Sequence, residues 1–152
     1  MRKNKIQKKI EKLPKYFIDS SVFLEVILRQ AKYDKCFSFF YDSNYKHRLV
    51  TPIVVLGEIV KTLNKIEDIM IKNQSYISFV DIFEKTEIGI MELSFECINN
   101  IGDIKTFEPY LQSYDSILFS SAVTENCDAF VTLDSDFSSI LSLKFDIRIK
   151  NP

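Results

Sequence analysis

Four acidic side chains stand where a predicted strand ends or a predicted helix begins. They are Asp19, Glu58, Asp115 and Asp134, and Asp136 closely follows the last of them. Each lies within or beside a mostly apolar segment, where a charged group is unfavourable unless something compensates it. A divalent metal ion would compensate several carboxylates at once, and metal-assisted phosphoryl chemistry is a common use of that arrangement.

The segments around these acids alternate between short apolar runs and stretches with apolar residues three or four positions apart, the spacing of a helix. The predicted strands are 16–18, 48–50, 89–93, 129–133 and 145–149. The predicted helices are 22–31, 33–44, 52–66, 75–84, 95–107, 113–125 and 137–141.

Helix boundaries are predicted from capping residues. Thr51 is expected as the N-cap of its helix with Pro52 at the first helical position, and Ser75 and Ser113 are expected to begin two later helices. Alternating strands and helices predict an α/β fold of three layers, α/β/α, with a central, mostly parallel sheet. Ligands of such sheets bind at the carboxyl ends of the strands, where the four acids are expected to converge.

Each acid also has a purely structural explanation. Asp19 could cap the helix that follows it, and Asp115 could favour a helix start through the macrodipole. Asp136 is expected to cap the short helix after it, and Glu58 could lie on a solvated helix face. Their combination is more specific than any one of them.

The motifs that contain these acids resemble the PIN domain family, and in particular VapC-like PIN ribonucleases of bacteria and archaea. They are Asp19-Ser20-Ser21, Glu58 in a helix, Asp115-Ser116-Ile117, and Thr132-Leu133-Asp134-Ser135-Asp136-Phe137. The resemblance covers residues 16–149, which leaves a basic arm at 1–15 ahead of a single PIN-like domain at 16–152. The arm and the LFSSAV continuation after Ile117 depart from the family pattern, but neither removes a carboxylate.

The resemblance implies an endoribonuclease that uses Mg²⁺ or Mn²⁺ to hydrolyse phosphodiester bonds of RNA. Metal ligands are expected among Asp19, Asp115, Asp134 and Asp136, while Glu58 would ligate or orient the attacking water. Ser20, Ser21 and Thr132 could hydrogen-bond the carboxylates or a phosphate, although turn and capping chemistry would also explain them.

The charge distribution predicts where RNA would be held. Residues 1–15 contain seven Lys or Arg and one Glu, a net charge of +6, so the remainder must carry −7 of the total −1. Because an acidic site repels a polyanion, RNA contacts are expected from basic groups outside it. The candidates are Lys8 and Lys9 in the arm and Lys46, Arg48 and Lys61 near the rim of the sheet. A solubilising leader would equally explain the arm.

Several function classes are disfavoured. Cys36, Cys97 and Cys127 have no CxxC spacing and are expected to be buried thiols in a reducing cytoplasm. The lone histidine, His47, makes a Cys/His zinc site improbable and is expected to be a surface residue rather than a general base. No secretory signal and no apolar run long enough to span a membrane are found.

Rival interpretations remain open. A protein antitoxin could regulate the chain by covering the acidic cleft, with the apolar sides of 33–45 and 53–63 as its groove, because many small PIN proteins are toxins of such pairs. A homodimer is also compatible with the family. A catalytically silent RNA-binding PIN protein is a further alternative, and a receiver-type domain is disfavoured because Asp134 stands where that fold would need a Lys.

Overall fold

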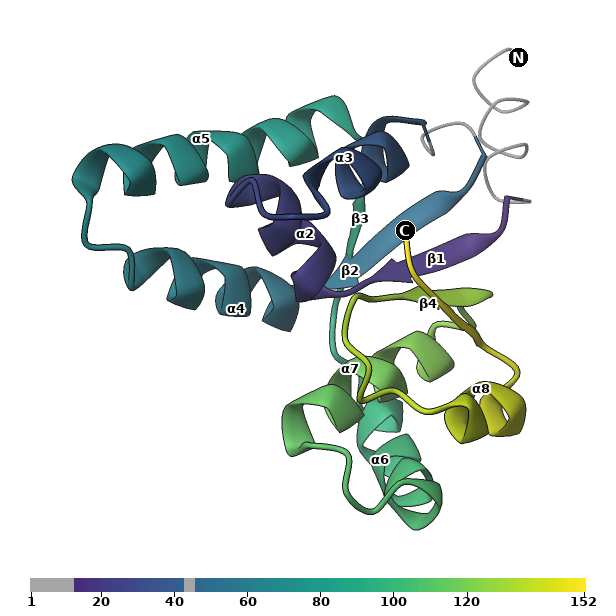
Figure 1. Ribbon diagram of the computed structural model, residues 1–152. Coiled ribbons are helices and arrows are strands. Elements are labelled where there is room, and N and C mark those ends of the chain that lie inside the picture. Colours follow the sequence, from purple (N-terminus) through teal and green to yellow (C-terminus); the bar gives the residue numbers. More distant parts are fainter. Residues whose placement is uncertain (1–12, 43–45) are drawn as a thin grey trace.

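The structure, a computed structural model, describes residues 13–42 and 46–152. In that part of the chain, five parallel strands form one sheet in the order β3-β2-β1-β4-β5 (Figure 1). The strands are β1 (Lys15–Ile18), β2 (Arg48–Pro52), β3 (Gly89–Met91), β4 (Ala129–Val131) and β5 (Arg148–Lys150). The helices are α2 (Ser20–Ile27), α3 (Tyr33–Asp42), α4 (Ile53–Asn64), α5 (Ile69–Lys85), α6 (Phe95–Phe107), α7 (Ser113–Thr124) and α8 (Ser139–Phe145). The predicted three-layer α/β class is confirmed.

Aromatic side chains pack both faces of the sheet. Helices α2–α5 lie on one side of it and α6–α8 on the other (Figure 1). On the α7 side, the rings of Phe17 and Phe130 stack with centroids 4.7 Å apart, and Phe119 lies 5.5 Å from Phe130. On the opposite side, Phe23 stacks on Phe83 at 5.6 Å. These rings fill part of the space between the layers, together with buried aliphatic side chains.

The strand order has a switch point between β1 and β4. From β1 the chain builds β2 and β3 on one side, then crosses to add β4 and β5 on the other. Ile18 pairs with Val131, and the Asp19 N–H donates to the Val131 carbonyl at 3.0 Å. The carboxyl ends of β1 and β4 therefore meet, and a crevice at such a point is the usual ligand site of a parallel sheet.

The start of α4 corrects one prediction. Thr51 and Pro52 belong to β2, Pro52 is the N-cap residue, and the helix begins at Ile53. The Thr51 hydroxyl does not cap a helix. It donates to the Ile18 carbonyl at 3.0 Å and so links β2 to β1.

Other boundaries also differ, among them the ends of strands 89–93 and 129–133, which stop at Met91 and Val131. Helix α5 begins at Ile69 instead of Ser75, because the Asp68 carboxylate caps it by accepting from the N–H groups of Met70 and Ile71. Ser113 is the first residue of α7 rather than its cap. Phe145 ends α8 instead of starting β5, because Asp146 adopts a left-handed φ of 54° that terminates the helix.

None of the helices described is long and apolar enough to cross a membrane. Cys36, Cys97 and Cys127 are buried free thiols, as predicted.

Candidate active site

Asp19 is held at the junction of β1 and α2. Its carboxylate accepts from the N–H of Ser20 and the hydroxyls of Ser21 and Thr132, each at 2.7 Å, and the residue is only 5% exposed. Burial raises the pKa of Asp19 in spite of these donors. The capping function considered from sequence is therefore real, and the same carboxylate also fixes the end of β1.

The Thr132 hydroxyl connects Asp19 to the loop after β4. While it donates to Asp19, it accepts from the Asp134 N–H at 2.9 Å, and the Asp136 N–H in turn donates to Asp134 Oδ1 at 2.9 Å. Asp134 and Asp136 are exposed. The expected capping of α8 by Asp136 is wrong, since the N-cap residue is Ser138.

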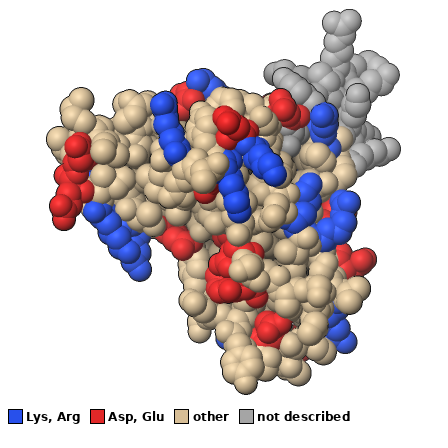
Figure 2. Space-filling view, in the orientation of Figure 1, with Lys and Arg blue, Asp and Glu red and all other residues tan. Residues whose placement is uncertain are grey.

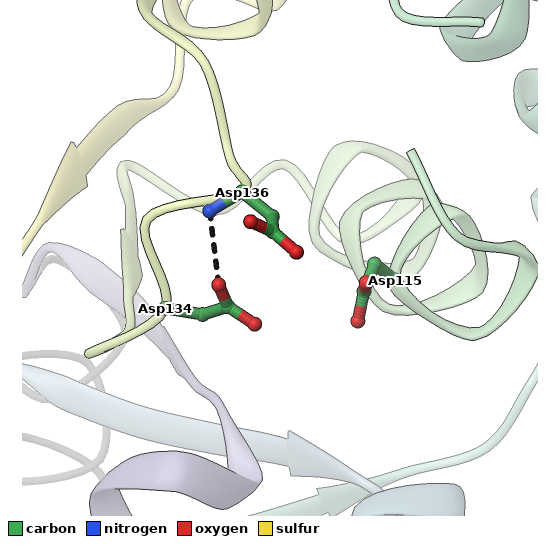
Figure 3. A group of neighbouring side chains, drawn as sticks. All are labelled: Asp115, Asp134 and Asp136. Atoms are coloured by element: carbon green, nitrogen blue, oxygen red, sulfur yellow. Dashed lines mark hydrogen bonds between the residues drawn. The ribbon is translucent and has the colours of Figure 1, made fainter. Parts of the chain in front are cut away.

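Asp115 meets these two acids from the other side of the crevice. It lies in the first turn of α7 and faces Asp134 and Asp136 (Figure 3). One carboxylate oxygen from each of the three lies within 4.8 Å of the others. Burial, followed by the charges of Asp134, Asp19, Asp136 and Glu58, raises the pKa of Asp115 to about 6. The structure therefore brings the other four predicted acids within electrostatic reach of Asp115.

Glu58 reaches the same place from α4. Its Oε2 atom is buried and has no hydrogen-bond partner among the described residues, an unfavourable state for a carboxylate oxygen. The neighbouring Tyr114 hydroxyl donates to the Val54 carbonyl at 3.0 Å and so ties α7 to α4. Burial, together with the nearby Glu58 carboxylate, raises the pKa of Tyr114.

These groups surround an open cavity of about 680 Å³. It is lined by Val54, Gly57, Glu58, Lys61, Gln112, Tyr114, Asp115, Asp134 and Asp136. Sequence reasoning missed Gln112 and Tyr114. Their place directly before Asp115 was the available signal, but a tyrosine near a helix start usually means packing.

The donor set of the cavity fits a hard divalent cation. Carboxylate oxygens are the ligands that Mg²⁺ and Mn²⁺ prefer, and three converge while the Oε2 of a fourth acid lacks a partner. Asp19, which was also predicted as a ligand, is not in this group of three, and its oxygens accept three short hydrogen bonds.

The predicted RNA-binding residues do not all reach the cavity. Lys61 lines it. Lys46 precedes β2 and Arg48 begins it, so both lie toward the opposite edge of the sheet from the acids, and their expected place at the rim is wrong. The prediction failed because strand β2 separates them from its carboxyl end. Lys8 and Lys9 lie outside the described residues.

His47 agrees only in part with the predicted surface position. It is half-buried, and its ring stacks on Tyr16 with centroids 4.0 Å apart. It does not line the acidic cavity, in agreement with the expectation that it is no general base there.

Comparisons with known proteins agree with this geometry. The model of the PIN domain matches residues 16–141. VapBC2 from Rickettsia felis, solved bound to a DNA fragment from its promoter, is similar at 18% identity and a TM-score of 0.69 over 90% of this chain and 98% of that one. VapBC-5 from Mycobacterium tuberculosis, a member of the VapBC family of toxin–antitoxin systems, is 14% identical with a TM-score of 0.67 over 91% and 99%.

FitAcB from Neisseria gonorrhoeae gives 14% identity and a TM-score of 0.66 over 90% of this chain and 97% of that one. No curated protein matches the sequence. At these identities the solved structures establish the fold, whereas the family model covers most of the chain together with all five acids. The chain therefore belongs to the PIN domain family.

Proposed function

We propose that this chain is a cytoplasmic Mg²⁺- or Mn²⁺-dependent endoribonuclease that acts as the toxin of a toxin–antitoxin pair. The observation that supports the nuclease is the convergence of Asp115, Asp134 and Asp136 around one cavity into which α4 also brings Glu58, whose Oε2 atom has no partner. So many carboxylates repel one another, and their charges add to the effect of burial in raising the pKa of Asp115.

A divalent ion, when bound, supplies an acidified water and neutralises charge that grows on the phosphoryl oxygens. Asp115, Asp134 and Asp136 would hold it. The free Oε2 atom of Glu58 is suited to orient the attacking water and accept its proton. Lys61, which lines the same cavity, can contact a phosphate of the substrate. Asp19, through Thr132, holds the loop that bears Asp134 against the end of β1.

The toxin assignment rests on the structural neighbours, which are described as VapBC and FitAcB proteins. A protein antitoxin, and a second copy of the chain, are the proposed partners. An RNA-binding chain without catalytic activity is the alternative. The intact acids weigh against it.

The test is cleavage of end-labelled single-stranded RNA by the full chain with Mg²⁺, with Mn²⁺ or with EDTA, beside calorimetric titration of each ion. Asp115→Asn is expected to lower the rate at least about a hundredfold and to weaken ion binding. Asp103→Asn, an exposed acid of α6 outside the cavity, is the matched control and should keep both. Equal cleavage by the two variants would indicate a contaminating nuclease, and ion binding without cleavage would favour the non-catalytic alternative.

A further inference from the structure

A cluster of cations surrounds His47 on the α3 side of the sheet. Lys150 Nζ lies 4.9 Å from the centroid of the Tyr16 ring and 6.0 Å from that of Phe39. The Arg148 guanidinium carbon lies 5.9 Å from the Tyr16 centroid, and its Nη2 donates to the Tyr16 hydroxyl at 3.4 Å. The imidazole of His47 stacks on the same ring. The buried ring of Tyr16 is therefore the common contact of Lys150, Arg148 and His47.

These cations form no ion pair in the described part of the chain, although Glu87 lines a small pocket together with His47. The two ion pairs found there are Lys15–Glu125 and Lys85–Asp81, so Lys46, Arg148 and Lys150 take part in none. Burial first, and then the charges of Lys150, Lys46 and Arg148, lower the pKa of His47. Several uncompensated positive charges therefore act on one point of the surface.

Lys150 connects this cluster to the strand end that bears the acidic site, whereas Lys46 and Arg148 lie toward the amino ends of the strands. The Thr132 N–H donates to the Lys150 carbonyl at 3.1 Å, and the Thr132 hydroxyl binds Asp19. Figure 2 shows Lys and Arg side chains gathered around the C-terminus below α3, with acidic side chains both among them and beneath them.

We infer that Lys46, Arg148 and Lys150, together with His47, form a phosphate-binding surface for an RNA strand whose scissile bond lies in the acidic cavity. The name "basic surface" denotes these four residues below. The inference rests on the proposed function for the identity of the ligand as RNA. The cavity repels a polyanion, and Lys61 is the only cation among the residues that line it, so most of the binding must come from elsewhere. An acidic protein could satisfy the same charges, but it would not have to extend into the cavity.

The first experiment measures binding without cleavage. Asp115→Asn protein in EDTA is titrated with labelled single-stranded RNA at several salt concentrations, with and without Lys46→Gln, Arg148→Gln and Lys150→Gln. Losing three phosphate contacts should lower the slope of log K against log salt by about 2. The matched control replaces Lys65, Lys72 and Lys144 by Gln, which removes the same charge from α5, α8 and the end of α4, and should leave the slope unchanged.

The second experiment tests whether RNA binds next to His47. His47 is the only histidine of the chain, so tag-free protein gives a single imidazole signal by NMR. RNA bound at the basic surface should shift this signal and raise the pKa of His47, because a phosphate offsets the neighbouring cations. Polyglutamate serves as the acidic-protein probe. If polyglutamate shifts the signal and RNA does not, the surface binds an acidic protein and the inference is wrong.

Kinetics separate the basic surface from the nuclease itself. In the otherwise wild-type chain, the three substitutions should raise KM for long RNA roughly tenfold and leave kcat on a short oligonucleotide unchanged. One outcome would overturn the basic surface alone. In it, wild type cleaves RNA, the salt slopes with and without the three substitutions are equal, and RNA does not shift the His47 signal. A His47 shift with RNA in a chain that never cleaves would overturn the proposed nuclease and retain the surface.

Discussion

The acidic cavity and the basic surface are two regions that each collect like charges, and the fold holds them in different ways. In the cavity, burial and short hydrogen bonds fix Asp19, and its neighbours are linked to it through Thr132. On the basic surface, the long side chains of Arg148 and Lys150 rest on one aromatic ring. Burial, followed by the neighbouring like charges, raises the pKa of Asp115 in the first region and lowers that of His47 in the second.

The difference indicates which ligand each region suits. A rigid set of converging oxygens matches a small cation of fixed geometry, and flexible cations match a polyanion that can approach in several ways. Substitutions in the cavity should therefore alter both stability and chemistry, whereas those on the basic surface should alter binding with little effect on stability.

The largest expected stability effect is at Asp19. Asp19→Ala removes the cap of α2 and leaves the hydroxyls of Ser21 and Thr132 without their acceptor, so unfolding by urea should show a loss of about 2–4 kcal/mol. Asp134→Ala, at an exposed acid of the same site, should cost less than about 1 kcal/mol. Equal losses would show that the cavity is not held together through Asp19.

A smaller effect is expected at Thr132. Thr132→Val keeps the shape of the side chain but removes the hydroxyl that donates to Asp19 and accepts from the Asp134 N–H, which should lower stability by about 1–2 kcal/mol and slow RNA cleavage. Thr132→Ser retains the hydroxyl and should restore activity. If the Ser and Val variants cleave equally slowly, the methyl group rather than the hydroxyl positions the loop.

The pH dependence of stability tests the repulsion in the cavity. Because the pKa of Asp115 is raised from 3.8 to about 6, the folded chain binds this proton more tightly than the unfolded chain. The free energy of unfolding in EDTA should therefore fall as pH rises through this range, and Asp115→Asn should remove part of the fall. Mn²⁺ should raise the melting temperature more above pH 6 than below it. An equal gain on both sides would argue against binding at these carboxylates.

The smallest effect is expected on the basic surface. Lys150→Gln should change stability by less than about 0.5 kcal/mol, since a partly exposed charge is removed from a group of like charges. The same substitution should raise the pKa of His47 measured by NMR titration, because Lys150 is the strongest of the cations that lower it. Lys65→Gln, remote from His47, should leave this pKa unchanged.

Much of the site could be predicted because its acidic residues stand in short motifs that can be recognised along the sequence. Each acid stands next to an apolar strand or at a helix start, and such positions are visible in one sequence. The parallel sheet then required these ends to meet, as they do at Asp19 and Thr132. Boundaries failed where a side chain had two possible partners: Thr51 could cap a helix or pair with Ile18, and the structure uses it for pairing.

The sequence by itself determined the α/β class, the family and the identity of the five acids, because apolar periodicity and short motifs depend on neighbours along the chain. Only the tertiary structure decided which carboxylates share one point, that Glu58 Oε2 has no partner, and that Lys46 lies with Arg148 and Lys150 instead of at the rim. These properties depend on distances between segments as far apart as β1, β2 and β5. Such distances follow from strand order and packing, which no local pattern specifies.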